Sequence, residues 1–242
     1  MHLHTQHNSG TLTVAGAKVK GNVWEYISQS INLYQNAGYE YIDVPWIVTR
    51  EALAVTLPLY KTGFSIFETI RLNSEANCLV GSAEQSFIDM MISGDPAMRA
   101  GGRYVAASPC FRDDAPDELH KTWFFKVELI DVFPSALTRV GPKREEAWRM
   151  CNTALRVMRD VAGAGDDEMK IVETPEGFDI EYCGIEVGSY GVRKLNHPDA
   201  KYEWVYGTGM AIPRFQIAYD VHLKESRKFW DERDREIDES SH

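Results

Sequence analysis

The chain has 242 residues, a formal net charge of −10 at pH 7 and a hydrophobic content of 44%. This is enough apolar material for one sizeable core, but too little for two full domains and a linker. The acidic balance argues against a large nucleic-acid footprint, because such binding depends on neutralised phosphates. No apolar run approaches the roughly 20 residues needed to span a bilayer.

The cysteine pattern and the N-terminus bear on location. The 4 cysteines are widely spaced, with no CxxC pair and no dense framework of the kind that small secreted proteins use. The N-terminus lacks a charged segment followed by an apolar one, which is the pattern of an export signal. We therefore expect a cytoplasmic protein with no membrane association.

The first elements along the chain are a helix and an interrupted strand. Apolar residues recur three or four apart over residues 22–37, and Gly38 can end that helix. Residues 39–48 predict a strand, interrupted by Pro45. Because proline cannot donate to a ladder, this strand should lie at a sheet edge or an interface. Residues 79–92 predict a turn followed by a short helix.

The middle of the chain alternates between strands and one long helix. Residues 104–110 and 123–133 are rich in β-branched and aromatic residues and should pair as antiparallel strands. The clearest helix opens at Gly141-Pro142 and ends at Gly163, with apolar residues at helical intervals. Residues 171–182 and 185–194 predict a further pair of strands.

The last third predicts one more strand and a helical end. Residues 202–206 predict a strand before a glycine turn at 207–209, and residues 215–223 an apolar helix after Pro213. The strongly charged run 224–239 predicts a solvated helix. Strands grouped together with one inserted helix indicate an α+β fold with a mostly antiparallel sheet flanked by helices.

The most informative segment begins at Arg112 and Asp114 and continues through His120, Phe124 and Glu128. The last three are spaced four residues apart, so in a strand their side chains should project from one face. An arginine can grip a phosphate and a phenylalanine offers a π-face to adenine. These residues therefore suit a nucleotide site; an ordinary amphipathic hairpin with a few surface charges is the alternative.

Two later segments support a nucleotide site. Carboxylates alternate along the strand from Asp179 to Glu186, which suits a hard cation such as Mg²⁺ beside a triphosphate, although a solvent-facing polar strand explains the same pattern. Gly207 and Gly209 would let backbone approach a nucleotide, and Arg214 follows where a helix turn would face it. A plain strand-to-helix turn with a surface arginine is the alternative here.

In this order, the segments resemble the catalytic core of class II aminoacyl-tRNA synthetases. Residues 38–45 resemble motif 1, the segment from Arg112 to Glu128 resembles motif 2, and the segment from Gly207 to Arg214 resembles motif 3. The resemblance covers nearly the whole chain and implies three parts: a lead-in at residues 1–21, a synthetase-like catalytic domain at 22–223 and a charged C-terminal helix or tail at 224–242.

Within the class, the likeness is greatest to seryl-tRNA synthetases and their shortened relatives, the amino acid:carrier protein ligases. Residues 79–84 resemble the loop that reads the substrate's amino group, and residues 104–112 and 125–128 are also similar. Residues 179–189 look more like the aspartyl and asparaginyl branch. The mixed signature leaves the amino acid open.

The resemblance implies ATP-dependent activation of an amino acid as an aminoacyl-adenylate, with Arg112 and Arg214 as catalytic residues. It implies that Arg112 binds the α-phosphate, that His120 and Arg214 bind the γ-phosphate, and that Phe124 binds adenine. The implied sites are, for ATP, Arg112, Asp114, His120, Phe124, Gly207, Gly209 and Arg214; for the amino acid, Ser82, Glu84, Glu128 and Ser189; and for Mg²⁺, Asp179 and Glu186.

The acceptor of the activated amino acid is expected to differ from tRNA. The core fills the chain and leaves no room for a tRNA-binding domain, and the short motif 2 loop carries acidic residues that would repel phosphates: Asp113, Asp114, Asp117 and Glu118. We expect a stand-alone enzyme with a carrier protein or another small acceptor. A non-catalytic regulatory paralogue, and a synthetase core that works with a separate tRNA-binding partner, are the alternatives.

Two further expectations concern assembly and zinc. Motif 1 implies a two-fold homodimer, because its edge strand and helix leave apolar surface that a second copy would cover. Certain relatives bind zinc through Cys, Glu and Cys, and Cys78, Glu128 and Cys183 are the candidates for such a site. Only Glu128 matches a motif position, so buried structural thiols are favoured over zinc.

Overall fold

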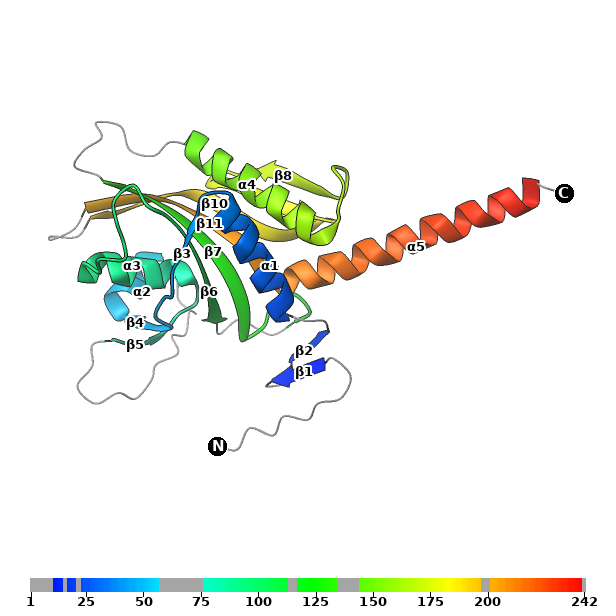
Figure 1. Ribbon diagram of the computed structural model, residues 1–242. Coiled ribbons are helices and arrows are strands. Elements are labelled where there is room, and N and C mark those ends of the chain that lie inside the picture. Colours follow the sequence, from blue (N-terminus) through cyan, green and yellow to red (C-terminus); the bar gives the residue numbers. More distant parts are fainter. Residues whose placement is uncertain are drawn as a thin grey trace.

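A seven-stranded sheet organises the fold. The computed structural model describes residues 11–14, 17–20, 23–56, 76–112, 117–134, 144–196 and 201–240. Asp114 and the predicted helix start at Gly141-Pro142 lie outside these residues. The strand order of the sheet is β3-β6-β7-β11-β10-β9-β8, and every neighbouring pair is antiparallel except the edge pair β3–β6 (Figure 1). The predicted α+β fold with a mostly antiparallel sheet is confirmed.

The strands of this sheet and of two small two-stranded sheets have well-defined bounds. The large sheet comprises β3 (Glu40–Tyr41), β6 (Arg103–Phe111), β7 (Trp123–Pro134), β8 (Met169–Glu173), β9 (Gly177–Tyr182), β10 (Ile185–Asn196) and β11 (Lys201–Ile212). The small sheets pair β1 (Thr11–Val14) with β2 (Ala17–Lys20), and β4 (Ile47–Thr49) with β5 (Ala76–Leu79). The antiparallel pair predicted at 104–110 and 123–133 is confirmed as β6 and β7.

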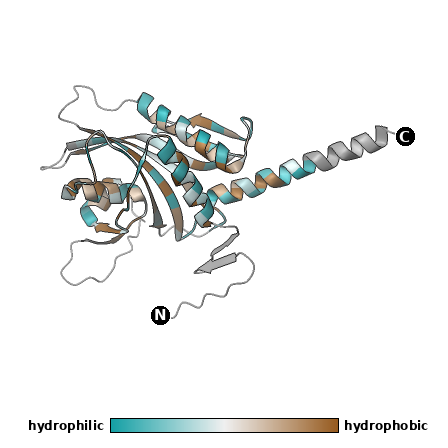
Figure 2. Ribbon diagram, viewed as in Figure 1, coloured by the Kyte–Doolittle hydropathy of each residue, from teal (hydrophilic) through white to brown (hydrophobic). Residues whose placement is uncertain are grey.

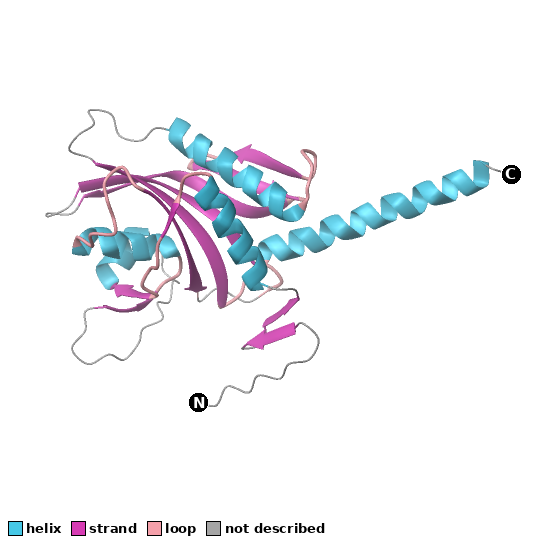
Figure 3. Ribbon diagram, in the orientation of Figure 1, coloured by secondary structure: helices cyan, strands magenta, loops and turns pink. Residues whose placement is uncertain are grey.

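Helices lie on both sides of the sheet (Figure 3). They are α1 (Val23–Asn36), α2 (Arg50–Thr56), α3 (Ala83–Ser93), α4 (Arg144–Ala162) and α5 (Arg214–Ser240). The predicted helix at 22–37 and the short helix predicted after a turn within 79–92 are confirmed as α1 and α3, and the helix predicted at 141–163 is confirmed as α4 from Arg144 on. Gly38 and Gly163 follow α1 and α4 with φ of 91° and 63°, a left-handed conformation that glycine adopts readily at a helix end.

Two hydrophobic clusters fill the two faces of the sheet. One packs α1, α4 and the first turns of α5 against it, through side chains that include Tyr34, Met158 and Phe215. The other packs α2 and α3 against it, with Phe87 and the fully buried Trp204. Figure 2 shows hydrophobic and hydrophilic residues mixed along α4, as expected for a helix with one side on the sheet. None of the helices in the described part of the chain is both long and apolar enough to cross a bilayer.

The single strand predicted for residues 171–182 is wrong, because this segment forms the hairpin of β8 and β9. Thr174 and Gly177 exchange backbone hydrogen bonds of 3.0 and 3.3 Å across the connecting turn. Pro175 lies in that turn, where its fixed φ favours a reversal and its missing N–H is not needed by a ladder.

The predicted glycine turn at 207–209 is also wrong, because β11 runs through it to Ile212. A Cβ on Gly207 would come within 2.4 Å of a Tyr190 ring carbon, and one on Gly209 within 2.9 Å of Val127 Cγ1. These glycines therefore allow close packing within a strand. The two helices predicted at 215–223 and 224–239 are one continuous helix, α5, which runs away from the sheet (Figure 1).

The strand predicted for residues 39–48 is divided between two sheets. β3 pairs with β6 at the edge of the large sheet, as predicted for this segment, and β4 pairs with β5 beyond Pro45. The helix α2, which directly follows β4, was not predicted; its seven residues are too few to show a clear helical period. The segment assigned to the lead-in contains the β1–β2 hairpin.

Candidate active site

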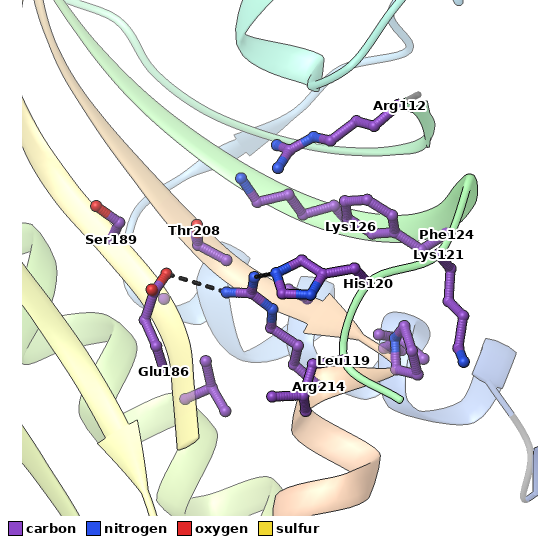
Figure 4. Close-up of a pocket in the computed structure, with 15 residues that line it drawn as sticks. Arg112, Leu119, His120, Lys121, Phe124, Lys126, Glu186, Ser189, Thr208 and Arg214 are labelled. Carbon is purple, nitrogen blue, oxygen red and sulfur yellow. Dashed lines mark hydrogen bonds and ion pairs between the residues drawn. The ribbon is translucent and has the colours of Figure 1, made fainter. Parts of the chain in front are cut away.

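A pocket of about 190 Å³ lies on the face of the sheet that carries α2 and α3 (Figure 4). Alternate residues of β7, from Phe124 through Lys126 and Glu128 to Ile130, share this face, and Ile130 belongs to the cluster under α3. The pocket is lined by residues of β7, β10, β11, the loop before β7 and the start of α5: Arg112, Leu119, His120, Lys121, Phe124, Lys126, Glu186, Val187, Gly188, Ser189, Thr208, Ala211, Ile212, Pro213 and Arg214.

Arg112 follows directly after β6 and is held at both its backbone and its side chain. Its backbone N–H donates to Thr122 O at 2.9 Å, which fixes it against the start of β7. Its Nε donates to Gly81 O at 3.0 Å, and its guanidinium carbon lies 5.2 Å from the centroid of the Phe124 ring. In Figure 4 the guanidinium points toward Lys126, inside the pocket. The two residues predicted for the α-phosphate and adenine are therefore neighbours.

Arg214 enters the same pocket from the first residue of α5. Its Nη2 lies 3.1 Å from His120 Nε2, and its Nη1 lies 3.3 Å from Glu186 Oε1 (Figure 4). Arginine can only donate, so His120 Nε2 must accept and its proton resides on Nδ1. Through these two contacts, Arg214 joins the loop before β7 to β10, and its guanidinium lies opposite Arg112.

His120 is oriented by Asp117 in the loop. The Asp117 carboxylate accepts hydrogen bonds from the backbone N–H of Leu119 at 2.7 Å, from the backbone N–H of His120 at 2.6 Å and from His120 Nδ1 at 2.8 Å. The His120 side chain, followed by these backbone donors, lowers the pKa of Asp117 to about 2. The prediction that His120, Phe124 and Glu128 share a strand face is wrong for His120, because β7 begins only at Trp123.

Next to the pocket lies a buried polar cluster, which we define as Ser82, Glu84, Lys126, Glu128, Arg193 and Trp204. The Ser82 hydroxyl lies 2.6 Å from both carboxylate oxygens of Glu128, and the backbone N–H of Glu84 donates to Oε2 at 2.7 Å. Lys126 Nζ donates to Oε1 of the same carboxylate. Burial works to raise the pKa of Glu128, but Lys126, Ser82 and the Glu84 N–H together keep this pKa below its usual range.

Glu84 is the second carboxylate of the cluster. Arg193 Nη1 donates to its Oε2, and Trp204 Nε1 donates to its Oε1 at 2.8 Å. Burial nevertheless raises the pKa of Glu84, against the opposing effect of Arg193. The Arg193 guanidinium carbon also lies 4.1 Å from the centroid of the Tyr206 ring. Both carboxylates predicted to bind the amino acid therefore have internal partners, and Lys126 links Glu128 to the pocket wall.

The pocket brings together six of the residues predicted for binding or catalysis: Arg112, His120, Phe124, Glu186, Ser189 and Arg214. The other described ones lie outside its lining. Ser82, Glu84 and Glu128 belong to the buried polar cluster, Asp179 lies on β9 opposite Ser189, and Gly207 and Gly209 pack within β11. Asp114 is not among the described residues.

Sequence reasoning missed two lining residues that alternation along a strand identifies. Lys126 lies midway between Phe124 and Glu128 on β7, and Thr208 is paired with Glu128 across β11 and β7. Both share the face of the predicted residues for that reason. Lys126 is the more consequential of the two, because its ammonium group lies between the pocket and the Glu128 carboxylate.

The residues present can hold Mg²⁺ only in part. In the described residues, no group of three or more His, Cys, Asp and Glu side chains is arranged to hold a metal ion, and this includes the candidates Cys78, Glu128 and Cys183. The strand register sets Glu186 opposite Glu181 and Asp179 opposite Ser189, with an irregularity after Glu186. Mg²⁺ is commonly bound by one or two carboxylates together with substrate phosphates. Glu186 at the pocket wall fits that arrangement.

Comparison with solved structures finds the same fold in tRNA synthetases. Two structures of pyrrolysyl-tRNA synthetase from Desulfitobacterium hafniense superpose with a TM-score of 0.59 at 16% and 18% identity, covering 81% and 82% of this chain and 69% and 67% of those chains. Seryl-tRNA synthetase from Pyrococcus horikoshii, in complex with ATP, gives a TM-score of 0.55 at 16% identity. That match covers 84% of this chain and 53% of the synthetase.

Sequence comparison adds no relative, because no protein-family model and no curated protein matches the chain. At 16–18% identity, the structural matches establish the architecture of the domain. The observed sheet order, the helices on its two faces and these matches agree with one another. The chain therefore has the fold of a class II aminoacyl-tRNA synthetase catalytic domain.

Proposed function

We propose that this protein activates an amino acid with ATP, forming an aminoacyl-adenylate and pyrophosphate. The observation that carries this proposal is the shared pocket of Arg112 and Arg214, two guanidinium groups that approach one cavity from β6 and α5. Phe124 lines the same cavity from β7, with its ring centroid 5.2 Å from the Arg112 guanidinium carbon, and His120 contacts Arg214. Two cations and an aromatic ring in one cavity suit a triphosphate attached to a base.

The reaction needs no nucleophile from the protein. A carboxylate oxygen of the amino acid attacks the α-phosphorus of ATP, the bond from this phosphorus to the bridging oxygen breaks, and pyrophosphate leaves with the electron pair. Catalysis then depends on aligning the two reactants and on stabilising the negative charge that develops at the α-phosphate. Arg112 is suited to that position because its Nε is already fixed by Gly81 O.

Arg214 would bind the γ-phosphate, and His120 would orient this arginine by accepting a hydrogen bond from its Nη2. In the free protein Arg214 is paired with Glu186, whose side chain is 51% exposed, so a phosphate can replace that carboxylate at little cost. Glu186, once released, and the phosphate oxygens would hold Mg²⁺, which supplies further positive charge to the triphosphate. Phe124 would stack on adenine.

The amino acid would lie on the Ser189 side of the pocket. Ser189 lines it directly, whereas Ser82, Glu84 and Glu128 are reached past Lys126. A substrate ammonium that binds Glu128 has to share this carboxylate with Lys126 Nζ. The other carboxylate of the cluster, Glu84, is already held by Arg193 and Trp204.

For the second half-reaction, we propose transfer to an acceptor other than tRNA, such as a carrier protein. The loop before β7 presents the exposed acidic residues Asp117 and Glu118 beside the pocket entrance residues Leu119 and His120. Carboxylates at that position repel a phosphate backbone. The net charge of −10 acts in the same direction.

Pyrophosphate exchange tests the proposal. Purified protein is incubated with ATP, Mg²⁺ and labelled pyrophosphate, and each of the twenty amino acids is tested separately. We expect exchange to depend on one amino acid or a small group of them. Arg112→Ala should abolish this exchange and leave the circular dichroism spectrum unchanged. Exchange that persists in Arg112→Ala would refute the role given to this arginine.

A second candidate, a non-catalytic regulatory paralogue, is favoured by one observation. Glu84 and Glu128, the carboxylates expected to read the substrate ammonium, are both satisfied by side chains of the protein itself. ATP binding separates the two candidates. If calorimetry detects no binding of ATP with Mg²⁺ at millimolar concentrations, the regulatory function is supported and adenylate formation is excluded.

We also propose a homodimer through the motif 1 region. Tyr41 in β3 and Trp46 just before β4 are 39% and 53% exposed, which is unusual for large apolar side chains at a sheet edge. A second copy related by a two-fold axis would cover both. Analytical ultracentrifugation at micromolar concentration should give a dimer; only monomer under these conditions would exclude this interface.

A further inference from the structure

Gln85 is a buried glutamine whose two amide atoms both have partners. It follows Glu84 in the first turn of α3 and is 2% exposed. Its Oε1 accepts a hydrogen bond from the backbone N–H of Gly81 at 2.7 Å, and its Nε2 donates to Thr56 Oγ1 at 2.9 Å. Gln85 does not line the pocket. Its amide instead connects the end of α2 to the loop before α3.

Gly81, whose N–H is held by Gln85, is also the residue whose carbonyl holds Arg112. Gly81 N–H donates to Gln85, and Gly81 O accepts from Arg112 Nε at 3.0 Å. The preceding carbonyl, Val80 O, accepts from Phe111 N–H at 2.7 Å. A Cβ on Gly81 would lie 3.4 Å from Phe111 O and 3.8 Å from both Arg112 Cγ and Gln85 Oε1, so Gly81 is packed between Gln85 and Arg112.

These contacts restrict the side chain of Arg112, which the backbone hydrogen bond to Thr122 leaves free to rotate. The backbone is held by Thr122, but an arginine side chain still has several rotatable bonds. A hydrogen bond at Nε restricts the plane of the guanidinium and so determines where its two terminal nitrogens meet a ligand. Gly81 O belongs to the peptide group that follows the N–H held by Gln85, so it can serve as a fixed acceptor only if the backbone torsions of Gly81 do not change.

We propose that Gln85 is a positioning residue for Arg112. By holding the Gly81 N–H, it fixes the backbone whose next carbonyl, Gly81 O, sets the orientation in which the guanidinium meets the α-phosphate. The proposal rests on the function proposed above, in which Arg112 binds that phosphate. Gln85 touches neither reactant, and it acts only through Gly81 and Arg112.

Two variants of neighbouring residues separate positioning from a general loss of stability. Gln85→Met keeps the length and volume of the side chain and removes both of its hydrogen bonds. Ser86→Ala is the matched control: Ser86 is the next residue of α3, is fully buried, and its Oγ donates to Pro45 O at 2.6 Å. Both variants therefore lose buried hydrogen bonds of α3, but only Gln85→Met releases the Gly81 N–H.

The first measurement does not require nucleotide. The Nε–H proton of Arg112, assigned by its disappearance in Arg112→Lys, is followed by solvent exchange in a heteronuclear NMR spectrum. We expect its exchange to be roughly tenfold faster or more in Gln85→Met and unchanged in Ser86→Ala, because only the first frees the Gly81 acceptor. Equal protection in wild type and Gln85→Met would overturn the proposal.

The second measurement is a kinetic double-mutant cycle with pyrophosphate exchange. Gln85→Met should lower kcat by roughly 10- to 100-fold, with a smaller effect on the KM for ATP. In an Arg112→Lys background, which has no Nε–H to position, it should add less than about twofold. Additive losses would overturn the proposal. If the wild type catalyses no exchange, the proposed function fails, and the NMR measurement alone decides whether Gln85 positions Arg112.

Discussion

The pocket and the buried polar cluster both contain glutamates paired with arginine or lysine, but the pair in the pocket is exposed to solvent and the glutamates of the cluster are buried. In the pocket, Arg214 and Glu186 are 26% and 51% exposed and lie 3.3 Å apart. In the cluster, the Glu84 and Glu128 side chains are 9% and 5% exposed, and Arg193 and Lys126 contact them more closely. Solvated pairs contribute little to stability, whereas buried pairs are costly to break.

This difference indicates that the pocket and the cluster have different roles. Charges in the pocket can exchange a protein partner for a phosphate, because water already screens their contacts. Charges in the cluster cannot do so without leaving a buried ion unpaired. The pocket is therefore suited to binding a ligand, and the cluster to holding β7, β10 and α3 in one arrangement behind it.

The largest effect on stability should come from breaking the cluster at Glu128. Glu128→Ala leaves Lys126 without its carboxylate and removes the acceptor of Ser82 and of the Glu84 N–H. We expect a loss of about 3–5 kcal/mol in the free energy of unfolding, measured by urea denaturation. Glu186→Ala is the control from the pocket and should cost about 0–1 kcal/mol. Equal losses in the two variants would remove the distinction between the two regions.

After Arg112, the largest effect on activity should come from the pocket at Arg214. Arg214→Ala removes the cation proposed for the γ-phosphate, and we expect pyrophosphate exchange to fall by about 10²–10³-fold. The free energy of unfolding should change by about 0–1 kcal/mol, because the pair with Glu186 is partly solvated. Arg149→Ala, at an exposed pair on α4, is the control and should leave exchange unchanged. Exchange that survives in Arg214→Ala would place the triphosphate elsewhere.

The sequence could predict those parts of the structure that depend on local patterns. Local patterns were enough for α1, α3, α4 and the β6–β7 pair, because period and end signals lie within each segment. They failed at Gly207 and Gly209, since the reason for these glycines is packing against Tyr190 and Val127, which are distant in sequence. They also failed at residues 171–182, where β-branched residues on both sides concealed the reversal at Pro175.

For the site, motif positions located the pocket and three residues of the cluster, Ser82, Glu84 and Glu128, but not the side chains that hold the two carboxylates. Arg112, His120, Phe124 and Arg214 line one cavity, as their order in the chain suggested. The internal partners of Glu84 could not be predicted, because Arg193 and Trp204 approach it from strands more than a hundred residues later. Whether a carboxylate is free or paired depends on such long-range contacts, and a single sequence does not encode them in any local pattern.

A smaller effect should appear in the pH dependence of stability, with opposite signs for the two buried carboxylates. The pKa of Glu128 is lowered from 4.5, so its ionised form stabilises the fold above that pH and the contribution is lost as the pH falls. The pKa of Glu84 is raised from 4.5 by burial, so its contribution is present at lower pH and is lost as the pH rises through the folded-state value.

Glutamine variants measured by urea denaturation between about pH 4 and 7 test this directly. The destabilisation caused by Glu128→Gln should shrink toward the acid end, whereas that caused by Glu84→Gln should shrink toward neutral pH. The two changes should therefore have opposite signs over this range. If both variants show the same sign of slope, the two carboxylates are not held in the different states described above.

The smallest effect should come from the loop, at Asp117. Asp117→Asn keeps an oxygen for the backbone N–H groups of Leu119 and His120, but its amide nitrogen cannot accept from His120 Nδ1. His120 then loses the contact that keeps its Nε2 free to accept from Arg214. We expect the KM for ATP to rise by roughly 2- to 10-fold with kcat nearly unchanged, because only phosphate binding is weakened. An equal fall in kcat would mean that this loop also acts on the transition state, and the division between a binding pocket and a rigid cluster would need revision.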